Sequence, residues 1–301
     1  MWKCEKDGSI FETTTNYQMK LIADSGSTKT DWACLQKDKT CIRFTSAGYN
    51  PNYVTAEYMS KDIQNSLPHC LDEAEITEIY FYGAGVTELQ FPFVRSVLQG
   101  IFPNASTIFV EMDLLASARA LLGDRPGFAA ILGTGTNSCL YDGRKITLNV
   151  DSLGFILGDE GSGAYMGKQL IIDYIRHNMS KDVWKMVEDY VKMDGDEIID
   201  QIYTKPYPNR WCAHFSKFIG DHLQDETSYF RNLVERSFSD LFEKIITHYP
   251  NYQAFELNCV GSIAYCFHDY LEKVASSFGM KMGKIIRYPI DGLVDYHSIH
   301  Q

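Results

Sequence analysis

The chain has 301 residues, 45% of them hydrophobic and 22% charged, so a disordered or fibrous protein is not favoured. This length allows about two domains, each large enough to bury its own core. Lys and Arg number 28 against 39 Asp and Glu, and the resulting net charge of −11 repels a phosphate backbone, which argues against nucleic acid as a partner.

The sequence also lacks clear signals for membrane insertion, secretion or disulfide formation. No run approaches the ~18 apolar residues of a membrane helix, and the first residues lack the basic-then-apolar layout of a secretory signal. We therefore predict a cytoplasmic protein without a membrane partner. The eight cysteines include no C-x-x-C pair and most lie in apolar runs. We expect reduced, buried thiols, with no disulfide and no cysteine-bound metal.

The patterns predict alternating strands and helices after a polar, Thr-rich extension at residues 1–18, expected to be disordered. Strands are predicted at residues 20–23, 31–36, 41–45, 78–82, 107–111, 128–133, 138–141, 255–260 and 284–288. Helical periodicity covers residues 54–64, 114–122, 163–178, 182–193, 213–223, 229–248 and 263–278. The protein is therefore predicted to be of mixed α/β class.

Each half of the chain opens in the same way, with a strand, a Gly/Thr-rich turn and a second strand running straight on. This arrangement occurs at residues 23–32 and again at 131–139 and indicates a duplicated domain. We predict an N-terminal lobe over residues 19–117, which residues from about 289 to 301 would join. The C-terminal lobe would cover residues 118–288 with a helical insertion, and a helix starting near Leu114 would link the lobes.

The first turn, residues 24–31, has the composition of a phosphate-binding turn, because small residues let several backbone N–H groups approach one phosphate. The chain has no G-x-x-x-x-G-K-[ST] motif and no helix follows the turn, so a hairpin type of nucleotide site is predicted. Hydroxyls of Ser27, Thr28 and Thr30 can donate to phosphate, and Asp24 can hold Mg²⁺ through water. The alternative is a polar hairpin turn without a ligand.

Two further Gly-rich segments follow. Residues 133–137, Gly-Thr-Gly-Thr-Asn, come directly after the apolar strand at 128–132, and two facing hairpins would clamp a triphosphate. Residues 158–163 carry Asp159 and Glu160 among three glycines at a helix start. The alternative for this last segment is an acidic helix entrance, which the helix dipole favours without any ligand.

Taken in order, residues 24–31, 133–137, 157–162 and 260–264 resemble the N-acetylglucosamine kinase family and its relatives, the benzoyl-CoA reductase activator type ATPases. Both belong to the superfamily of sugar kinases, heat-shock ATPases and actin. The resemblance runs from about Met19 to the end of the chain. It implies a two-lobed, duplicated ribonuclease H-like (actin-like ATPase) α/β fold with a cleft between the lobes, and ATP and Mg²⁺ as cofactors. Ser25 and Ser27 stand where many relatives carry glycine.

The resemblance also implies residue roles. ATP would be held by Asp24, Gly26, Ser27, Thr28, Lys29 and Thr30 of the first hairpin, by Gly133, Thr136 and Asn137 of the second, and by Gly261 and Ser262 at the adenosine end. The sugar would be bound by Asn50, Gly83, Thr134, Gly135, Gly154, Phe155 and Asp159. Asp113, which follows a strand and opens a helix, matches the family's catalytic aspartate. The alternative for Asp113 is a structural N-cap.

Three functions compete. The first is an ATP-dependent kinase acting on a primary hydroxyl of an amino sugar, with N-acetylglucosamine and its 6-phosphate as first choice. The second is an activator-like ATPase, but such activators carry a cysteine-ligated iron–sulfur cluster, and no cysteine pair here lies beside a Gly-rich loop. The third, a sugar-binding regulator, lacks a helix-turn-helix segment before Met19. The identity of the sugar and the oligomeric state, a homodimer included, are left open.

Overall fold

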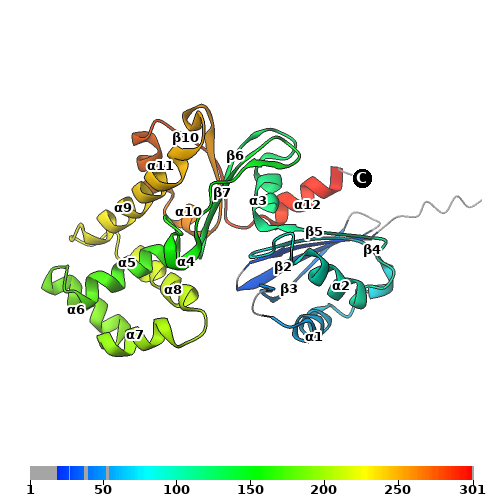
Figure 1. The fold of residues 1–301 in the computed structure, drawn as a ribbon, viewed down its shortest axis with the longest axis horizontal. Helices are drawn as coiled ribbons and strands as arrows, with labels where there is room; N and C mark the ends of the chain where they lie inside the picture. The colour runs from blue at the N-terminus through cyan, green and yellow to red at the C-terminus, as the bar shows by residue number, and fades with distance from the viewer. Residues whose placement is uncertain (1–18, 27, 37–39, 52–53, 300–301) are drawn as a thin grey trace, which may run out of the picture.

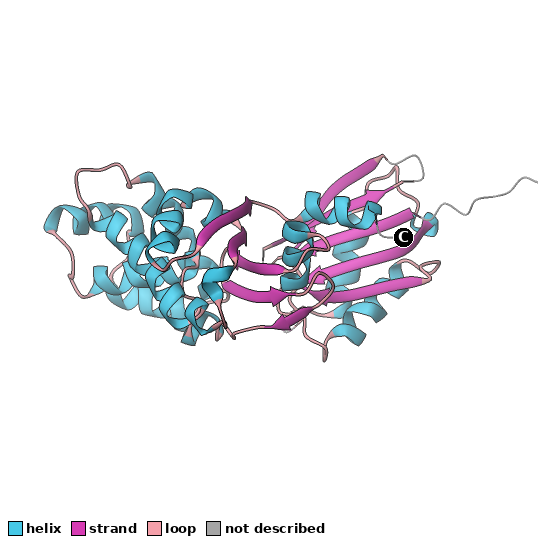
Figure 2. Ribbon diagram, turned by 90° about the horizontal axis from the view of Figure 1, so that it is seen from above, coloured by secondary structure: helices cyan, strands magenta, loops and turns pink. Residues whose placement is uncertain are grey.

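The computed structural model describes residues 19–26, 28–36, 40–51 and 54–299, so the expected extension at 1–18 and the side chain of Ser27 lie outside the described residues. Two five-stranded sheets form the centre of the molecule, each at the heart of one lobe (Figures 1 and 2). One group of helices extends away from the second sheet, at the end of the molecule opposite the first sheet (Figure 2).

The first sheet has the order β3-β2-β1-β4-β5. Its strands are β1 (Met19–Ser25), β2 (Lys29–Leu35), β3 (Cys41–Ala47), β4 (Ile76–Gly83) and β5 (Thr107–Met112). β1 and β2 form an antiparallel hairpin, whereas β4 and β5 run parallel to β1. In register, Ser25 pairs with Gly83 and Gly83 pairs with Met112. The carboxyl ends of three strands therefore meet at one edge.

The second sheet repeats this order, as β10-β9-β6-β7-β8. Its strands are β6 (Gly127–Leu132), β7 (Thr136–Tyr141), β8 (Ile146–Leu148), β9 (Glu256–Val260) and β10 (Lys281–Ile286). β6 and β7 form the hairpin, and β9 and β10 run parallel as β4 and β5 do. Each antiparallel triplet is thus followed by two parallel strands reached by a crossover. The predicted duplication and the α/β actin-like fold are confirmed.

Helices cover both sheets. In the first lobe these are α1 (Ala56–Ser66) and α2 (Phe91–Ile101), and a 3₁₀ turn covers Glu73–Glu75. Between β8 and β9 lie α4 (Gly154–Leu157), α5 (Gly163–Ile175), α6 (Lys181–Val191), α7 (Gly195–Tyr203), α8 (Pro208–Asp221), α9 (Tyr229–Lys244) and 3₁₀ turns at Ile246–His248 and Tyr252–Ala254. They are followed by α10 (Ser262–Cys266) and α11 (His268–Ser277). The core of this lobe joins sheet residues such as Phe128 to helix residues such as Phe238.

Two helices connect the lobes, α3 (Asp113–Leu122) and α12 (Ile290–Ile299), and they pack on each other (Figure 1). α3 contacts strands of both sheets, and α12 returns from the second sheet to β1 and β2. A shared core joins Ile22 of the first sheet, Ala129 of the second and Leu293 of α12. The predicted lobe boundary at 117/118 falls inside α3, and the division into domains stays a prediction.

Some elements differ from the sequence prediction. The patterns gave no strand at β8 and no helix at α2, α4, α7 or α12. α2 has a proline in its first turn, where its missing N–H costs nothing, and it otherwise buries an apolar stripe. The single helix predicted at 263–278 is broken at Phe267, and β10 starts three residues before its predicted position, at 281 instead of 284.

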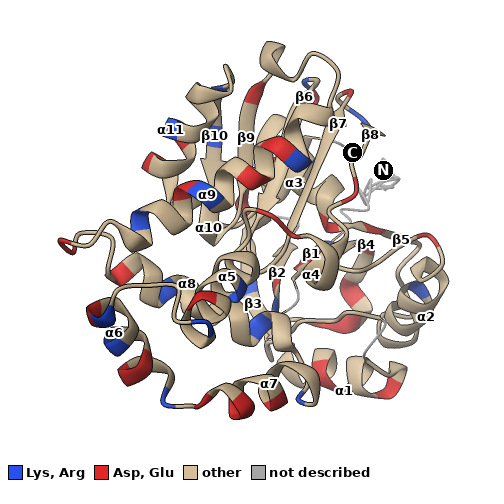
Figure 3. Ribbon diagram, turned by 60° about the vertical axis from the view of Figure 1, so that its left-hand side comes forward, with Lys and Arg blue, Asp and Glu red and all other residues tan. Residues whose placement is uncertain are grey.

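Surface features complete the description. Acidic residues are spread over helices of both lobes, with basic residues interspersed (Figure 3). Cys34, Cys139, Cys212 and Cys259 are buried as expected, but Cys70 and Cys266 are exposed, contrary to the expectation of buried thiols. None of the helices among the described residues combines the length and hydropathy needed to span a bilayer.

Candidate functional site

Two aspartates lie at the edge where β1, β4 and β5 end. Asp24 is the penultimate residue of β1, and Asp113 directly follows Met112, the last residue of β5. Burial, and then the negative charges of Asp113 and Asp31, raise the pKa of Asp24 to about 8, although Lys29 opposes the rise. The register of parallel strands therefore brings together carboxylates that are 89 positions apart in the sequence (113 − 24).

Asp113 occupies the first position of α3, and Met112, not Asp113, is the N-cap residue. Asp113 is thus not the N-cap residue itself, and its role stays a prediction. Burial raises the pKa of the Asp113 carboxyl to about 6, against hydrogen bonds from the backbone N–H groups of Leu114 and of Asp113 itself. A carboxylate that is more basic than an ordinary aspartate but ionised at neutral pH has the properties of a general base.

The first hairpin turn exposes Thr28 and Lys29. The Lys29 ammonium lies 2.8 Å from Asp31 Oδ1 and 4.5 Å from the ring centroid of Tyr288. The hydroxyl of Thr30, by contrast, is buried between Ser25 Oγ at 2.8 Å and the carbonyl oxygen of Ala47 at 2.7 Å. Its geometry does not support the expected hydroxyl contact with phosphate, because Thr30 joins β2 to β3 instead.

Asn50 and Gly83 reach the same edge. Gly83 is the last residue of β4 and pairs with Ser25. Two residues further on, Gly85 adopts a φ of +71°, and a Cβ there would lie 2.5 Å from Asn50 Nδ2. Asn50 therefore sits against the loop that leaves β4. Asp24, Asn50, Gly83 and Asp113 form one cluster on the first sheet, which we call the acidic edge.

The second hairpin turn is bound to the segment that carries Asp159. The backbone N–H of Thr136 donates to Asp159 Oδ1 at 3.2 Å, and a Cβ on Gly135 would lie 2.9 Å from Asp159 Oδ2. The Thr136 hydroxyl donates to the carbonyl of Glu160 at 2.7 Å. Asn137 Oδ1 accepts from the N–H of Ser138 and from Asn149 Nδ2. The side chains of Thr136 and Asn137 are thus hydrogen-bonded within the protein, and Thr134 is half-buried.

Asp159 is only 8% exposed and has a φ of +60°. Its burial raises its pKa, while the Thr136 N–H and the positive charge of Lys168 oppose that rise. The turn is also tied to α5, since the N–H groups of Gly163 and Ala164 donate to the carbonyls of Gly133 and Thr134 at 2.9 and 3.1 Å. The two Gly-rich segments at residues 133–137 and 158–163 are therefore hydrogen-bonded into a single unit.

Gly261 closes this unit from β9. Its φ of +127° suits glycine, and a Cβ there would lie 2.2 Å from the carbonyl oxygen of Leu132. Ser262, the first residue of α10, is exposed. Gly133–Asn137, Asp159 and Gly261 make a second cluster, which we call the glycine cluster. Gly154 and Phe155 lie in α4, which precedes Asp159 in the chain.

The acidic edge and the glycine cluster lie on different sheets, and α3 packs against strands of both. Sequence reasoning missed Lys168, whose charge acts on Asp159. Its only sequence signal is its place on the helix that follows the Gly-Asp-Glu-Gly motif. No group of three or more His, Cys, Asp or Glu positioned to hold a metal occurs in the part of the chain that the structure describes.

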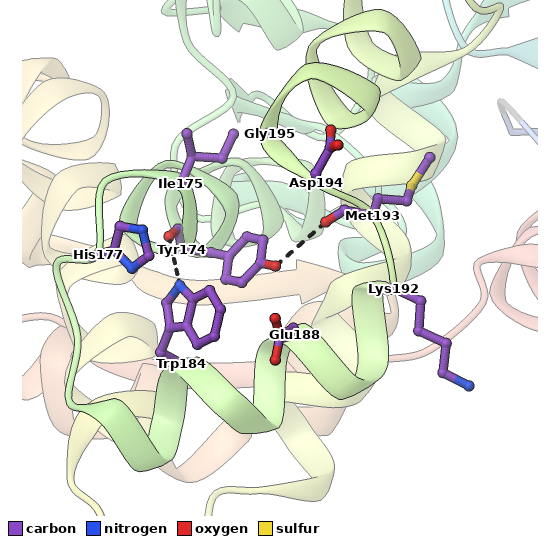
Figure 4. A pocket seen from close by; sticks show the side chains of 9 residues that line it. All are labelled: Tyr174, Ile175, His177, Trp184, Glu188, Lys192, Met193, Asp194 and Gly195. Atoms are coloured by element: carbon purple, nitrogen blue, oxygen red, sulfur yellow. Dashed lines mark hydrogen bonds between the residues drawn. The ribbon is translucent and has the colours of Figure 1, made fainter.

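A cavity of about 390 Å³ lies elsewhere, among α5, α6 and α7 in the helical insertion (Figure 4). Trp184 stacks on Tyr174 at 5.4 Å between ring centroids and donates its indole N–H to the Tyr174 carbonyl. The Tyr174 hydroxyl donates to the carbonyl of Met193, and Asp194 caps α7. These polar groups serve the fold of the insertion and include none of the residues predicted to act on substrate.

Fold and site geometry together define a duplicated two-sheet protein of the actin-like type. A structure from Porphyromonas gingivalis, provisionally assigned as an N-acetylglucosamine kinase, shares 37% identity over 94% of this chain and 99% of its own, with a TM-score of 0.87. The chain therefore belongs to the N-acetylglucosamine kinase family.

More distant structures share the fold alone. One from Chromobacterium violaceum, also provisionally assigned as an N-acetylglucosamine kinase, is 15% identical over 93% of this chain and 99% of its own, with a TM-score of 0.72. MreB 5 of Spiroplasma citri, bound to AMPPNP, is 11% identical over 94% of this chain and 96% of its own, with a TM-score of 0.57. No family model and no curated protein matches the chain.

Proposed function

We propose that this protein transfers the terminal phosphoryl group of ATP to the primary hydroxyl of an amino sugar, with N-acetylglucosamine as substrate and its 6-phosphate as product. Membership of the N-acetylglucosamine kinase family supports a sugar kinase. The observation that carries the chemistry is the placement of Asp113 beside Asp24 at the acidic edge, with the pKa of Asp113 raised to about 6 by burial.

Asp113 would act as the general base. Phosphoryl transfer needs little covalent help, so a kinase works by positioning, charge neutralisation and removal of the proton from the attacking hydroxyl. With a pKa of about 6, Asp113 is ionised at neutral pH and accepts that proton more readily than an ordinary aspartate. It opens α3, the helix that contacts strands of both sheets.

Asp24 would hold Mg²⁺ through water. The residues fit this ion, because Mg²⁺ keeps several waters and uses one or two carboxylates plus substrate phosphates instead of a full set of protein ligands. Asp24 is also repelled by Asp113 and Asp31, and a nearby cation relieves this repulsion. When bound, the ion neutralises charge on the phosphates. The exposed ammonium of Lys29 adds positive charge at the same turn.

Asp159 and Asn50 would hold the sugar hydroxyls from the two lobes. Asp159 is nearly buried, so a hydrogen bond to its carboxylate is little weakened by competing water. Gly135 allows this carboxylate to lie against the second turn, since a Cβ would occupy its place. Thr134, Gly154 and Phe155 would complete the wall on the same side. Gly261 and Ser262 would take the adenosine end.

A coupled ADP-release assay with Mg-ATP tests this function. The panel comprises N-acetylglucosamine, glucosamine, glucose and N-acetylmuramic acid, with a sugar-free control. We expect release to require a sugar and to be fastest with N-acetylglucosamine, and ³¹P–¹H coupling in the product to place the phosphate at C6. Equal release without sugar would indicate an ATPase, and the absence of release with every sugar would contradict a kinase.

A further inference from the structure

α4 is an unusual element, because it is a single turn of helix with its apolar side chains in solvent. Leu153, Ile156 and Leu157 are 59%, 84% and 74% exposed. Its backbone is closed by two hydrogen bonds, from Gly158 N–H to the Gly154 carbonyl and from Asp159 N–H to the Ser152 carbonyl. One turn of helix is not stable alone, so α4 depends on its neighbours for its position.

Lys168 provides such a contact from α5, which lies beside α4 (Figure 1). Its ammonium donates to the carbonyl oxygen of Phe155 at 2.7 Å and lies 5.2 Å from the Phe155 ring centroid and 5.4 Å from that of Tyr165. The first N–H groups of α5 in turn donate hydrogen bonds to the carbonyls of Gly133 and Thr134. Lys168 therefore links α4 to α5, the helix that is also hydrogen-bonded to the second turn.

The same ammonium acts on Asp159. Its positive charge favours the ionised carboxylate, against the desolvation of that buried group. Burial lowers the pKa of Lys168, and the negative charge of Asp159, and more weakly that of Glu160, opposes this. One side chain thus contacts the backbone of α4 and stabilises the charge of the residue that α4 leads into.

We propose that Lys168 is a positioning residue, whose ammonium holds α4 and the Asp159 carboxylate in one arrangement and so pre-forms the sugar side of the site. This inference rests on the proposed function for its effect on catalysis. Groups that bind substrate must be held within a fraction of an ångström by residues around them, and small misplacements cost large factors in rate. ATP, bound by other elements, would not be affected directly.

The kinetic test compares Lys168→Met with Lys168→Arg, which keeps the charge and a donor. For Lys168→Met we expect KM for N-acetylglucosamine to rise about 10-fold or more, with KM for ATP within about 2-fold of the wild-type value. Lys168→Arg should restore KM for the sugar to within about 3-fold, because a guanidinium can donate to the same carbonyl. Thermal unfolding of each variant checks that the fold is retained.

Lys244→Met is the matched control. Lys244 lies 5.7 Å from the same Tyr165 ring, but its ammonium pairs with Glu160 and Asp240 instead of with the backbone of α4. Its KM for the sugar should stay near the wild-type value. Equal changes of both KM values in Lys168→Met, an unchanged KM for the sugar, or the same effect in Lys244→Met would each overturn the proposal.

Hydrogen exchange gives a readout that does not need activity. In the sugar-free protein, the amides of residues 154–159 should exchange about 10-fold faster or more in Lys168→Met than in the wild type, with no change in residues 28–35. Unchanged exchange at 154–159 overturns the inference even if the enzyme is an active kinase. Wild-type protein that phosphorylates no sugar refutes the proposed function instead, and the exchange result still decides the role of Lys168.

Discussion

Asp24 and Asp113 lie at the same sheet edge but differ in their protonation. The pKa of Asp113 is raised to about 6 and that of Asp24 to about 8. The Asp24 pKa is the higher because burial and two negatively charged neighbours both disfavour its ionised form. Paired titratable groups whose environments separate their pKa values often divide the chemical roles. In the proposed function, Asp113 would remove the proton and Asp24 would be the group that a cation stabilises.

Asp113→Asn should lower kcat by about 10²- to 10⁴-fold, the usual contribution of a general base, with the fold retained. ADP release with saturating Mg-ATP and sugar measures this, with circular dichroism as the check on folding. Asp182→Asn is the control, since Asp182 also occupies the first turn of a helix, α6, outside both clusters. A folded Asp113→Asn enzyme with near-normal turnover would remove Asp113 from the mechanism.

The pH profile gives a second test of the same residue. The base must be ionised, so kcat/KM should fall about tenfold per pH unit once the pH drops below the Asp113 pKa of about 6. An aspartate with the usual pKa of 3.8 would keep activity down to about pH 4. The profile is measured from pH 4.5 to 8 at fixed ionic strength. A flat profile down to pH 4.5 would contradict the raised pKa.

At the scale of elements, α5 and α8 pack closely enough that one glycine is required. A Cβ on Gly167 would lie 1.9 Å from the carbonyl oxygen of Cys212, in the middle of α8. This close approach fixes α5, which carries Lys168 and begins at the second turn. Packing inside the insertion therefore helps to position the glycine cluster.

We expect Gly167→Ala to destabilise the protein by about 1–3 kcal/mol, the usual range for overpacking a core. Gly100→Ala is the control, because Gly100 also lies within a helix, is exposed, and has no atom within 4 Å of an added Cβ. That change should stabilise by about 0.5–1 kcal/mol through helix propensity. Urea unfolding measures both. Equal stability of the two variants would rule out the close contact.

At the scale of the molecule, α12 fastens the C-terminal end of the chain to the first lobe. Lys20 Nζ donates to the carbonyl of His297 at 3.3 Å, and the Tyr82 hydroxyl lies 2.9 Å from His297 Nε2. Arg43 pairs with Asp291 at 2.6 Å, although both side chains are largely exposed and the pair adds little stability. The shared core around α3 and α12 also joins the two sheets.

Leu293→Ala tests this shared core. Leu293 is fully buried, so its truncation should cost about 2–5 kcal/mol. Ile299→Ala on the same helix is the control, because Ile299 is 77% exposed and its loss should change stability by less than about 0.5 kcal/mol. Thermal and urea unfolding give both values. A small effect of Leu293→Ala would mean that α12 does not hold the lobes together.

The sequence by itself determined the features that depend on local chemistry. Runs of Gly and Thr directly after apolar strands specify hairpins, and the structure has them at β1–β2 and β6–β7. The order of four motifs was enough to predict the family and the fold. Asp113 could be singled out because its position, after a strand and at the start of a helix, is visible in the chain. Its role as base, like every site assignment, stays a prediction.

Only the tertiary structure decided which side chains are available for a ligand. The sequence predicts Thr30 as a phosphate-binding hydroxyl and Thr136 as an ATP-binding residue, but Ala47 and Glu160, 17 and 24 positions away, accept the hydrogen bonds of their hydroxyls. The contact of Lys168 could not be predicted from the sequence, since its partner is the carbonyl of Phe155 on another element. Hydrogen bonds and burial at such positions depend on atoms that folding brings together from distant parts of the chain, and a local pattern does not contain them.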